Sequence, residues 1–277
     1  MTNIELDMNQ YMINQKPYYL PVGDEVEIFR AAYLSKIPVI LKGPTGTGKT
    51  RFVEYMTYLL GKELKRSIPL ITVACHEDLT TTDLVGRYLL KGEETVWIDG
   101  PLTIAVTSGG ICYLDEIVEA RKDTTVIIHP LSDHRRILPM DKKGKIIKAH
   151  ENFFLVISYN PGYQSVIKDL KESTKQRFIA IDFDYPGREN ETQIICNESE
   201  TTEELSNDLA LLGEKIRNLK GHALNEGAST RVLIYAARLI KQGIPPARAC
   251  HVAATSLLSE EKEVQSAINE IINSIFP

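Results

Sequence analysis

The eight residues GPTGTGKT at Gly43–Thr50 constrain the fold of this chain more than any other segment. They match the pattern G-x-x-x-x-G-K-[ST]; an apolar run, Ile37–Leu41, precedes them and a helical-looking segment, Arg51–Leu60, follows. A strand, a glycine-rich turn and a helix N-terminus together form a phosphate-binding site. The alternative is a chance turn of glycine and lysine, against which the flanking strand and helix argue. The chain is therefore predicted to bind a nucleotide.

Each residue type in this loop has a physical reason to lie at a phosphate. Its glycines permit backbone turns that side chains would block, so that N–H groups face phosphate oxygens. Lys49 brings a positive charge to the terminal phosphates, and the Thr50 hydroxyl is a ligand for Mg²⁺. We therefore expect ATP and Mg²⁺ to bind. The expected nucleotide-binding residues are Gly43, Pro44, Thr45, Gly46, Thr47, Gly48, Lys49, Thr50 and Arg51.

The bulk properties of the chain narrow its class. Its 277 residues suffice for one large or two modest domains, and its formal net charge of −5 argues against a dedicated nucleic-acid binder. We see no signal peptide and no apolar stretch that approaches the length of a membrane span. These features predict a cytoplasmic protein. Reduced thiols, without a disulfide or zinc framework, are expected at the widely spaced Cys75, Cys112, Cys196 and Cys250.

Short apolar runs alternate with helical or irregular segments as far as Phe183. They are Val39–Leu41, Leu70–Ala74, Gly110–Leu114, Phe153–Ser158 and Phe178–Phe183, and a helix candidate, Asp24–Ser35, precedes them. Such alternation predicts an α/β fold, a doubly wound parallel sheet with helices on both faces.

After Pro186 the pattern becomes helical, with apolar residues at three- and four-residue spacing. The predicted helices are Thr202–Leu219, Thr230–Gln242, Pro245–Leu258 and Glu260–Phe276. Ser229 and Thr230 are N-cap candidates for the second of them. A boundary near Pro186–Asn190 gives an α/β nucleotide-binding domain at 1–187 and a small all-helical lid domain at 188–277.

Two insertions interrupt the first domain. The insertion Asp83–Leu102 holds the single tryptophan, Trp97, between two glycine turns, and its pattern predicts a short hairpin. The insertion Arg135–Ala149 also predicts a hairpin, with its turn centred on Lys143.

An apolar run ends in two adjacent carboxylates, Asp115 and Glu116, as a Walker B segment requires. Asp115 would hold Mg²⁺ directly or through water, and Glu116 would act as the base that polarises the attacking water. A strand-end acid is often only a helix N-cap, but the preceding P-loop favours the catalytic interpretation.

The next apolar run closes with Asn160, followed by Pro161 and Gly162. Asn-Pro-Gly is typical of a simple turn. The functional alternative places the Asn160 amide beside the γ-phosphate, because ligands bind at the carboxyl ends of parallel strands. There the amide would orient water without neutralising Glu116.

Two arginines fit a role at the γ-phosphate. Arg177 lies just before the last strand, and Arg231 opens a helix of the second domain. A guanidinium there would stabilise transition-state charge, and one supplied by a neighbouring subunit would couple hydrolysis to subunit motion. A single arginine is more often a solvated surface residue. Arg135 and Arg136 are weaker candidates, because either can contact Asp133 or solvent.

Together these features resemble an AAA+ ATPase, and the two insertions resemble the helix-2 insert and the pre-sensor-1 hairpin of the MoxR branch. Within that branch the chain resembles the CbbQ/NirQ/NorQ group from about Lys16 to its C-terminus. The segments that carry the resemblance are Leu41–Met56, Val73–Leu90, Trp97–Leu102, Tyr113–Arg136, Ile157–Ser165, Ser173–Phe178 and Glu226–Arg231. Thr47 stands where many relatives carry cysteine, a conservative difference.

The resemblance implies roles for three residues that the residue patterns left open. Asn160 matches sensor 1, Arg177 matches the arginine finger and Arg231 matches sensor 2. It also implies a homo-hexameric ring with nucleotide between subunits, and a partner that carries a von Willebrand factor A domain.

By the same resemblance, the insertion at 83–102 would face the ring pore. Its candidate contacts with a pore or partner are Arg87, Tyr88 and Trp97. The alternative for Trp97 is an aromatic side chain packed under a loop.

The client enzyme is left open by the site motifs, which subfamily members share. General similarity favours the CbbQ type, which acts with a CbbO partner to free Rubisco of inhibitory sugar phosphates; activation of nitric oxide reductase is the alternative. A P-loop small-molecule kinase is a more distant possibility that would need an acceptor pocket. A nucleic-acid motor is disfavoured by the acidic charge balance.

Overall fold

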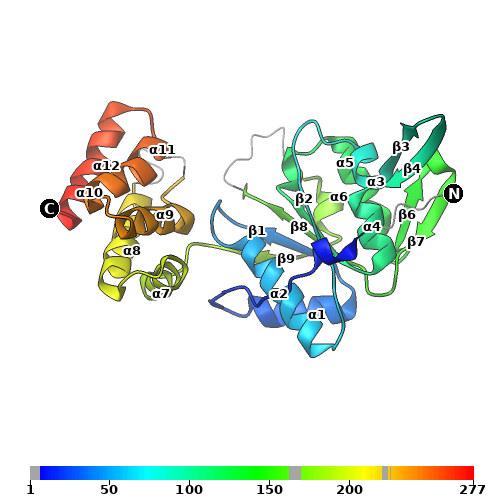
Figure 1. Cartoon of the computed structure of the whole chain (residues 1–277), viewed down its shortest axis with the longest axis horizontal. Coiled ribbons are helices and arrows are strands. Elements are labelled where there is room, and N and C mark those ends of the chain that lie inside the picture. The colour runs from blue at the N-terminus through cyan, green and yellow to red at the C-terminus, as the bar shows by residue number, and fades with distance from the viewer. Residues whose placement is uncertain (1–6, 162–169, 220–223, 225) are drawn as a thin grey trace. The chain divides into compact units, whose positions relative to one another are not determined.

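The computed structural model describes residues 7–161, 170–219, 224 and 226–277 (Figure 1). The chain divides into two compact units. The first consists mainly of Gly23–Lys42 and Lys49–Asp182, and the second consists of Tyr18–Val22, Gly43–Gly48 and Phe183–Pro277. The glycine-rich loop is thus grouped with the helical unit, whereas Lys49 and the residues after it belong to the sheet unit.

A five-stranded parallel sheet forms the centre of the first unit (Figure 1). Its strand order is β2-β5-β8-β1-β9. Its strands are β1 (Val39–Lys42), β2 (Leu70–Ala74), β5 (Ile111–Asp115), β8 (Phe154–Tyr159) and β9 (Ile179–Asp182). All five predicted apolar runs are confirmed as strands. The predicted α/β class is therefore confirmed as well.

Helices flank this sheet. They are α1 (Glu25–Ser35), α2 (Lys49–Glu63), α3 (Thr81–Val85), α4 (Pro101–Ser108), α5 (Lys122–Ile127) and α6 (Glu172–Lys175). The helix expected at 24–35 is α1, which begins one residue later because Asp24 lies at its N-cap.

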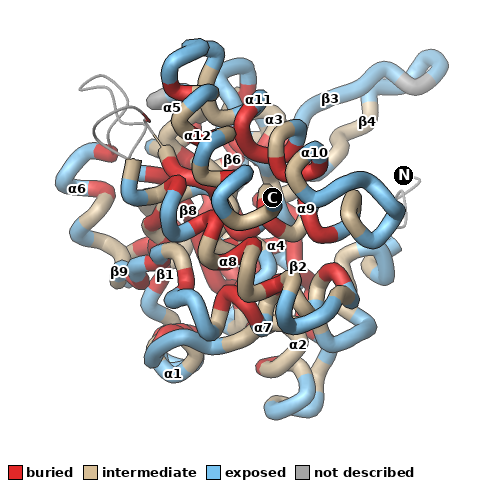
Figure 2. The backbone as a smooth tube through the Cα atoms, turned by 90° about the vertical axis from the view of Figure 1, so that its left-hand side faces the viewer, coloured by how far each residue is buried: buried red, intermediate tan, exposed pale blue. Residues whose placement is uncertain are grey.

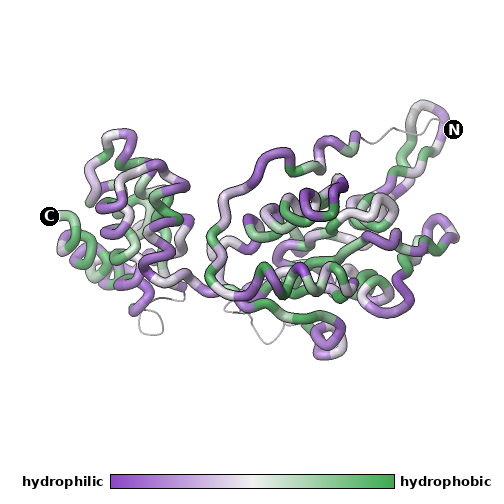
Figure 3. The backbone as a smooth tube through the Cα atoms, turned by 90° about the horizontal axis from the view of Figure 1, so that it is seen from below, coloured by the Kyte–Doolittle hydropathy of each residue, from purple (hydrophilic) through white to green (hydrophobic). Residues whose placement is uncertain are grey.

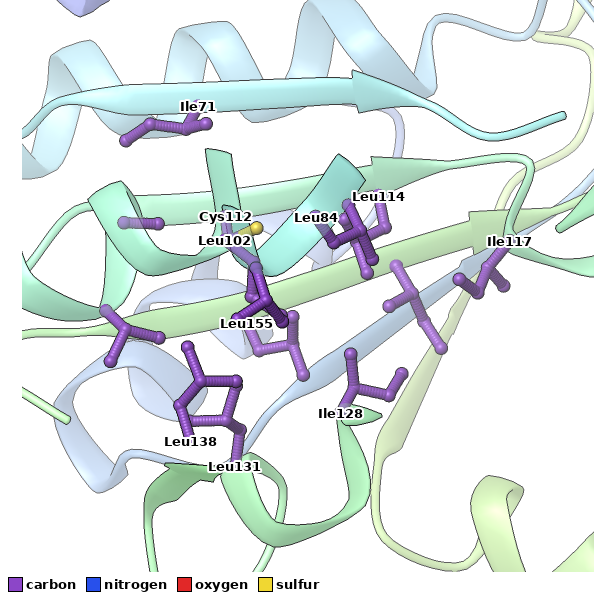
Figure 4. Close-up of a cluster of buried hydrophobic side chains, with 14 of the residues drawn as sticks. Ile71, Leu84, Leu102, Cys112, Leu114, Ile117, Ile128, Leu131, Leu138 and Leu155 are labelled. Carbon is purple, nitrogen blue, oxygen red and sulfur yellow. The ribbon is translucent and has the colours of Figure 1, made fainter. Parts of the chain in front are cut away.

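Both faces of the sheet are covered, which explains why its central strands are apolar without alternation. On β8, Phe154 lies under α1, where its ring centroid is 5.4 Å from that of Phe29. The next residue, Leu155, points to the opposite face and joins a cluster with Leu84 of α3 and Leu102 of α4 (Figure 4). Every residue of β8 is buried (Figure 2). Helices on the two sides therefore hold the strand whose end carries Asn160.

The two predicted hairpins are confirmed. In the first, β3 (Gly86–Lys91) pairs antiparallel with β4 (Glu94–Asp99); in the second, β6 (Ile137–Met140) pairs with β7 (Lys145–Lys148). The turn of the second hairpin contacts α3 and the first hairpin. Lys142 Nζ donates to the Thr82 hydroxyl at 3.0 Å, and Lys143 Nζ lies 5.1 Å from the centroid of the Trp97 ring.

The second unit is helical. Its helices are α7 (Arg188–Ser199), α8 (Glu203–Arg217), α9 (Thr230–Lys241), α10 (Pro246–Cys250), a π-helix (His251–Thr255), α11 (Ser256–Leu258) and α12 (Lys262–Ile275). The four predicted helical segments are all present, and the third is divided by the π-helix. Hydropathy alternates along α12 (Figure 3), because its buried residues recur every four positions at Val264, Ile268 and Ile272.

Helix α7 is absent from the expectations drawn from the sequence. Its buried residues are Glu191, Thr192, Ile195 and Ser199, so three of the four positions that face the core are polar. An apolar period of three to four residues cannot reveal a helix whose buried face is polar. Among the described residues, no helix has both the length and the apolar character that crossing a membrane requires.

Candidate nucleotide site

The glycine-rich loop joins β1 to α2 with the backbone geometry that its composition predicts. Gly43 and Gly46 have φ angles of 156° and 75°. A Cβ on Gly43 would lie 2.1 Å from the Phe183 carbonyl oxygen, so glycine is required there for packing as well as for conformation. The Thr47 hydroxyl donates to the Pro44 carbonyl at 2.9 Å and closes the turn.

Lys49 and Thr50 form the first turn of α2. Lys49 is only 6% exposed, so its charge is held within the site and not in bulk water. The Thr50 hydroxyl donates to Asp115 Oδ2 at 3.4 Å. Helix N-termini carry partial positive charge, so this turn adds to the attraction that Lys49 has for phosphate.

Asp115 ends β5 and is held by hydroxyl groups on both of its carboxylate oxygens. Its Oδ1 accepts from the Tyr113 hydroxyl at 2.6 Å and from Ser158 Oγ. Burial, followed by the charge of Asp115, raises the pKa of Tyr113, so the phenol stays protonated and donates. Together with Thr50, these groups fix the orientation of the carboxylate without a positive charge.

Glu116 has the left-handed backbone conformation, with φ at 54°, which costs free energy for a residue with a side chain. Its N–H donates to Ser158 Oγ at 3.1 Å. Burial raises the pKa of Glu116, the charge of Lys49 opposes the rise, and Asp115 adds to it. Glu116 therefore combines a strained backbone with a carboxylate of raised pKa, and a raised pKa is what a general base requires.

Asn160 follows β8, which is the neighbour of β5 in the sheet. It is 2% exposed, and a hydrogen bond from its backbone lowers the pKa of Glu116 against the larger effect of burial. The structure thus brings the Asn160 backbone and Glu116 together at the carboxyl ends of adjacent parallel strands. The role of the Asn160 amide beside a γ-phosphate stays a prediction. The turn expected after Asn160 continues into 162–169, which lie outside the described residues.

Arg177 lies between α6 and β9 in the sheet unit. Its guanidinium donates to the Ser173 carbonyl of α6, and its Nε is buried without a hydrogen-bond partner in the described part of the chain. Burial and then the Arg177 charge lower the pKa of His129. The described hydrogen bond of Arg177 thus joins residues that are close in the sequence, and its Nε has no acceptor among the described residues.

Arg231 lies in the first turn of α9, after the N-cap residue Ser229, whose Oγ accepts from the Val232 N–H. The predicted N-cap is confirmed. Within the helical unit, a Cβ on Gly46 would lie 2.6 Å from Ser229 Cβ and 3.5 Å from Arg231 Cβ. The structure therefore places the start of α9, with Arg231, directly against the phosphate loop.

The three candidates in the first hairpin differ in exposure. Arg87 makes a 3.4 Å ion pair with Asp83. Tyr88 is 47% exposed and meets the edge of the Trp97 ring at a centroid distance of 4.9 Å. Trp97 donates from Nε1 to Asp99 Oδ1 at 2.6 Å and packs against the core cluster. Trp97 is thus packed on the core on one side and partly exposed, whereas Tyr88 leaves much of its side chain at the surface.

The two weaker arginine candidates have partners outside the nucleotide site. Arg135 donates to both carboxylate oxygens of Asp133, from Nε to Oδ1 at 3.0 Å and from Nη2 to Oδ2 at 2.7 Å, which is the alternative contact considered from the sequence. Arg136 donates to the Phe153 carbonyl at 2.8 Å, and its ring contact is with the same residue. Arg135 pairs within its own loop, whereas Arg136 joins that loop to the segment that follows β7.

The hydroxyl groups that orient Asp115, those of Tyr113 and Ser158, were not predicted from the sequence. The contact of Tyr113 with Asp115 could have been predicted, because residues two apart on a strand lie on the same face of the sheet. For Ser158 the signal was weaker, since it required knowing that β8 lies next to β5 and in which register; that register pairs Leu114 with Ile157.

A divalent cation fits the oxygens at this strand edge. Thr50 Oγ1 and Asp115 Oδ2 are adjacent, and hydroxyl and carboxylate oxygens are the donors that Mg²⁺ takes in phosphate sites. Among the described residues, no group of three or more His, Cys, Asp and Glu could hold a metal. Mg²⁺ needs few protein ligands where phosphate oxygens and water complete its shell.

Models of known protein families match both parts of the chain. Residues 38–178 match a family described as "AAA domain (dynein-related subfamily)", and residues 191–275 match "CbbQ/NirQ/NorQ C-terminal". The protein CbbQ of Hydrogenophilus thermoluteolus is 56% identical over 268 residues, which cover 97% of this chain and 98% of CbbQ. The protein NorQ of Paracoccus denitrificans is 53% identical over 260 residues, which cover 94% of each chain.

A solved structure supports the fold alone. The RuvB mutant of Thermotoga maritima superposes with a TM-score of 0.52 at 14% sequence identity, covering 91% of this chain and 69% of the RuvB chain. At that identity, the likeness extends to the path of the backbone and not to the chemistry of the site.

Proposed function

Since this chain belongs to the CbbQ/NirQ/NorQ family of AAA ATPases, we propose that it hydrolyses ATP to remodel a client protein. The observation that carries the catalytic part is the strand edge where Thr50, Asp115, Glu116 and Asn160 meet. This edge combines a cation site, a carboxylate of raised pKa and a neutral amide. Hydrolysis needs these three groups, and phosphate binding alone does not.

Lys49 binds the terminal phosphates, while Thr50 and Asp115 hold Mg²⁺. When bound, Mg²⁺ offsets the negative charge that develops on the phosphate oxygens. Glu116 takes the proton of the attacking water, and its raised pKa favours that transfer. Asn160 orients the water, because an amide donates a hydrogen bond without neutralising the base.

Arg177 acts as the arginine finger of a neighbouring subunit in a hexameric ring, and Arg231 acts as sensor 2. The place of Arg177 just before the last strand of the sheet, between α6 and β9, supports the first role, because it matches the finger position of the family. The packing of Arg231 on Gly46 supports the second. Residues 1–187 form the nucleotide-binding domain, and 188–277 form the lid that moves with nucleotide state.

The favoured client is Rubisco, with a partner that carries a von Willebrand factor A domain and resembles CbbO. The similarity to NorQ makes nitric oxide reductase the second candidate. Identities of 56% and 53% do not separate the two. Arg87, Tyr88 and Trp97 are proposed to contact the client or the partner from the first hairpin.

The trans role of Arg177 is tested by mixing subunits. Arg177→Ala and Lys49→Ala should each lose turnover, and mixed rings should regain some, because one subunit keeps the nucleotide loop and the other the finger. Turnover that stays absent in mixed rings of verified composition would assign Arg177 a role in its own subunit. Sizing with and without ATP and Mg²⁺ supplies the control, and a monomer in every condition would favour a P-loop kinase.

The client is tested by reactivation. The chain, with its partner and ATP, should restore Rubisco inhibited by a bound sugar phosphate, while Glu116→Gln should not. If Rubisco stays inhibited and nitric oxide reductase gains activity under the same conditions, the second candidate replaces the first.

A further inference from the structure

A buried ion pair in the helical unit lies outside every nucleotide motif. Glu191 of α7 has no exposed surface, and Arg217 at the end of α8 donates to both of its carboxylate oxygens, with Nη1 to Oε2 at 2.8 Å. A buried ion pair is a weak source of stability, because removing two charges from water offsets much of their attraction. Packing alone therefore gives little reason for a pair at this position.

The ion pair contacts the residues on both sides of the α9 N-cap. Arg217 Nε donates to the Ala228 carbonyl at 2.9 Å, and the Thr230 hydroxyl donates to Glu191 Oε1 at 2.7 Å. Ser229, between these two residues, is the N-cap itself. One ion pair thus holds the chain immediately before and immediately after the point where α9 begins.

Neighbouring groups enclose the guanidinium of Arg217. Its Cζ lies 4.3 Å from the centroid of the Tyr185 ring, which covers one face. A Cβ on Gly227 would lie 2.5 Å from Arg217 Cγ, so the glycine is needed for the side chain to pass. Enclosure of this kind restricts the guanidinium to one geometry.

The start of α9 packs in turn on the phosphate loop. Because a Cβ on Gly46 would clash with Ser229, the loop and the first turn of α9 have no free space between them. A change in the position of Ser229 therefore changes either the loop or the distance from the loop to Arg231.

We propose that Glu191 and Arg217 are positioning residues that set the first turn of α9 against the phosphate loop, so that Arg231 meets the terminal phosphate of ATP. This proposal rests on the proposed function, because the role of Arg231 is assigned there. Glu191 and Arg217 are not catalytic residues; they act through Ser229, Thr230 and Arg231.

The test removes both charges together. Glu191→Met/Arg217→Met keeps the side-chain volume, and replacing a buried pair by apolar residues is often neutral for folding. Glu200→Met/Lys241→Met is the matched control, because that 2.7 Å ion pair joins the other ends of α7 and α9 at the surface. Affinities for ATP and ADP, kcat, KM and the melting temperature are measured for each.

In Glu191→Met/Arg217→Met, the ratio of the affinity for ATP to that for ADP should fall about tenfold, and kcat should fall by the same factor. A tenfold loss corresponds to one charge-assisted contact. Both should remain unchanged in the control. In an Arg231→Ala background the same double change should cause no further loss, because residues that act through Arg231 have no effect without it. An equal loss with and without Arg231, or full ATP preference in a folded double variant, would overturn the proposal.

Two further measurements keep the proposal testable. If the double variant does not fold, Thr230→Val removes one hydrogen bond and should reduce the ATP preference in the same Arg231-dependent way; unchanged preference overturns the proposal. Turnover of ATP by the unaltered chain tests the proposed function separately. A chain without turnover that still loses its ATP preference in these variants would reject the ATPase and retain the positioning role.

Discussion

The half-buried carboxylates at the sheet edge and the buried carboxylate of Glu191 are held in opposite ways. At the sheet edge, the described hydrogen bonds to Asp115 come from hydroxyl groups, and Glu116 has a strained backbone and a raised pKa. In the helical unit, Glu191 meets a guanidinium on both oxygens and a hydroxyl as well.

The kind of hydrogen-bond donor at each carboxylate matches the role that we propose for it. A carboxylate that must accept a cation or a proton needs orientation without neutralisation, which hydroxyl groups provide. A carboxylate that must fix a helix needs full pairing, because any unpaired buried charge is costly. The five predictions that follow break or sharpen this contrast, from the largest effect to the smallest.

Lys49→Ala should abolish ATP binding, with an affinity loss of at least about a hundredfold, since the buried ammonium is the cation of the loop. Calorimetric titration with ATP measures it. Lys62→Ala, an exposed lysine near the other end of α2, is the control and should bind normally. Unchanged affinity in Lys49→Ala would reject the phosphate-loop assignment.

Glu116→Gln should bind ATP within a few-fold of the unaltered chain but lower kcat by about 10²–10⁴, the range for a general base. Single-turnover hydrolysis of labelled ATP measures the loss. Glu119→Gln, three residues along, should retain turnover. If Glu116→Gln also retained it, the base would have to be another group.

Glu191→Ala should lower the free energy of unfolding by about 3–5 kcal/mol, because Arg217 is left buried without its counter-charge. Glu116→Ala should lower it far less, since ionised Glu116 is already disfavoured by burial. Urea denaturation of both variants gives the comparison. Equal losses would mean that the two carboxylates are held alike, contrary to the contrast drawn from the geometry.

Buried thiols report on each unit separately. Burial raises the pKa of Cys75 in the sheet unit and of Cys250 in the helical unit from 9.0 to about 12. Both should therefore resist iodoacetamide at pH 8 until the protein unfolds locally.

The same pKa shifts predict a pH dependence of stability. Because the folded state favours the neutral thiol, the free energy of unfolding should fall as pH rises from about 9 toward 12. Fast native-state labelling of either cysteine, located by mass spectrometry, would contradict its burial.

Arg135→Ala should have the smallest effect, with no measurable change in turnover or melting temperature, because exposed ion pairs such as Arg135 with Asp133 contribute little. Steady-state ATPase assays and thermal denaturation check this. A clear loss of turnover in an assembled ring would return Arg135 to the list of finger candidates.

Much of the site could be predicted from the sequence because its residues follow strand ends. Lys49 is found by the glycine-rich pattern, whereas Asp115, Glu116 and Asn160 are each found as polar residues at the end of an apolar run. The hydroxyl of Ser158 could not be assigned, since its partner Asp115 is on a different strand and the strand order decides their contact. Helix α7 was missed for a different reason, its polar buried face.

The sequence by itself determined the phosphate loop, the parallel sheet, the two hairpins and most of the helices, because these depend on local periodicity and on fixed spacing. Only the tertiary structure decided that Glu191 pairs with Arg217, and that Ser229 lies on Gly46. Those contacts join residues that are far apart in the chain, and their energies depend on burial and on distance. Neither quantity exists until the helices have packed.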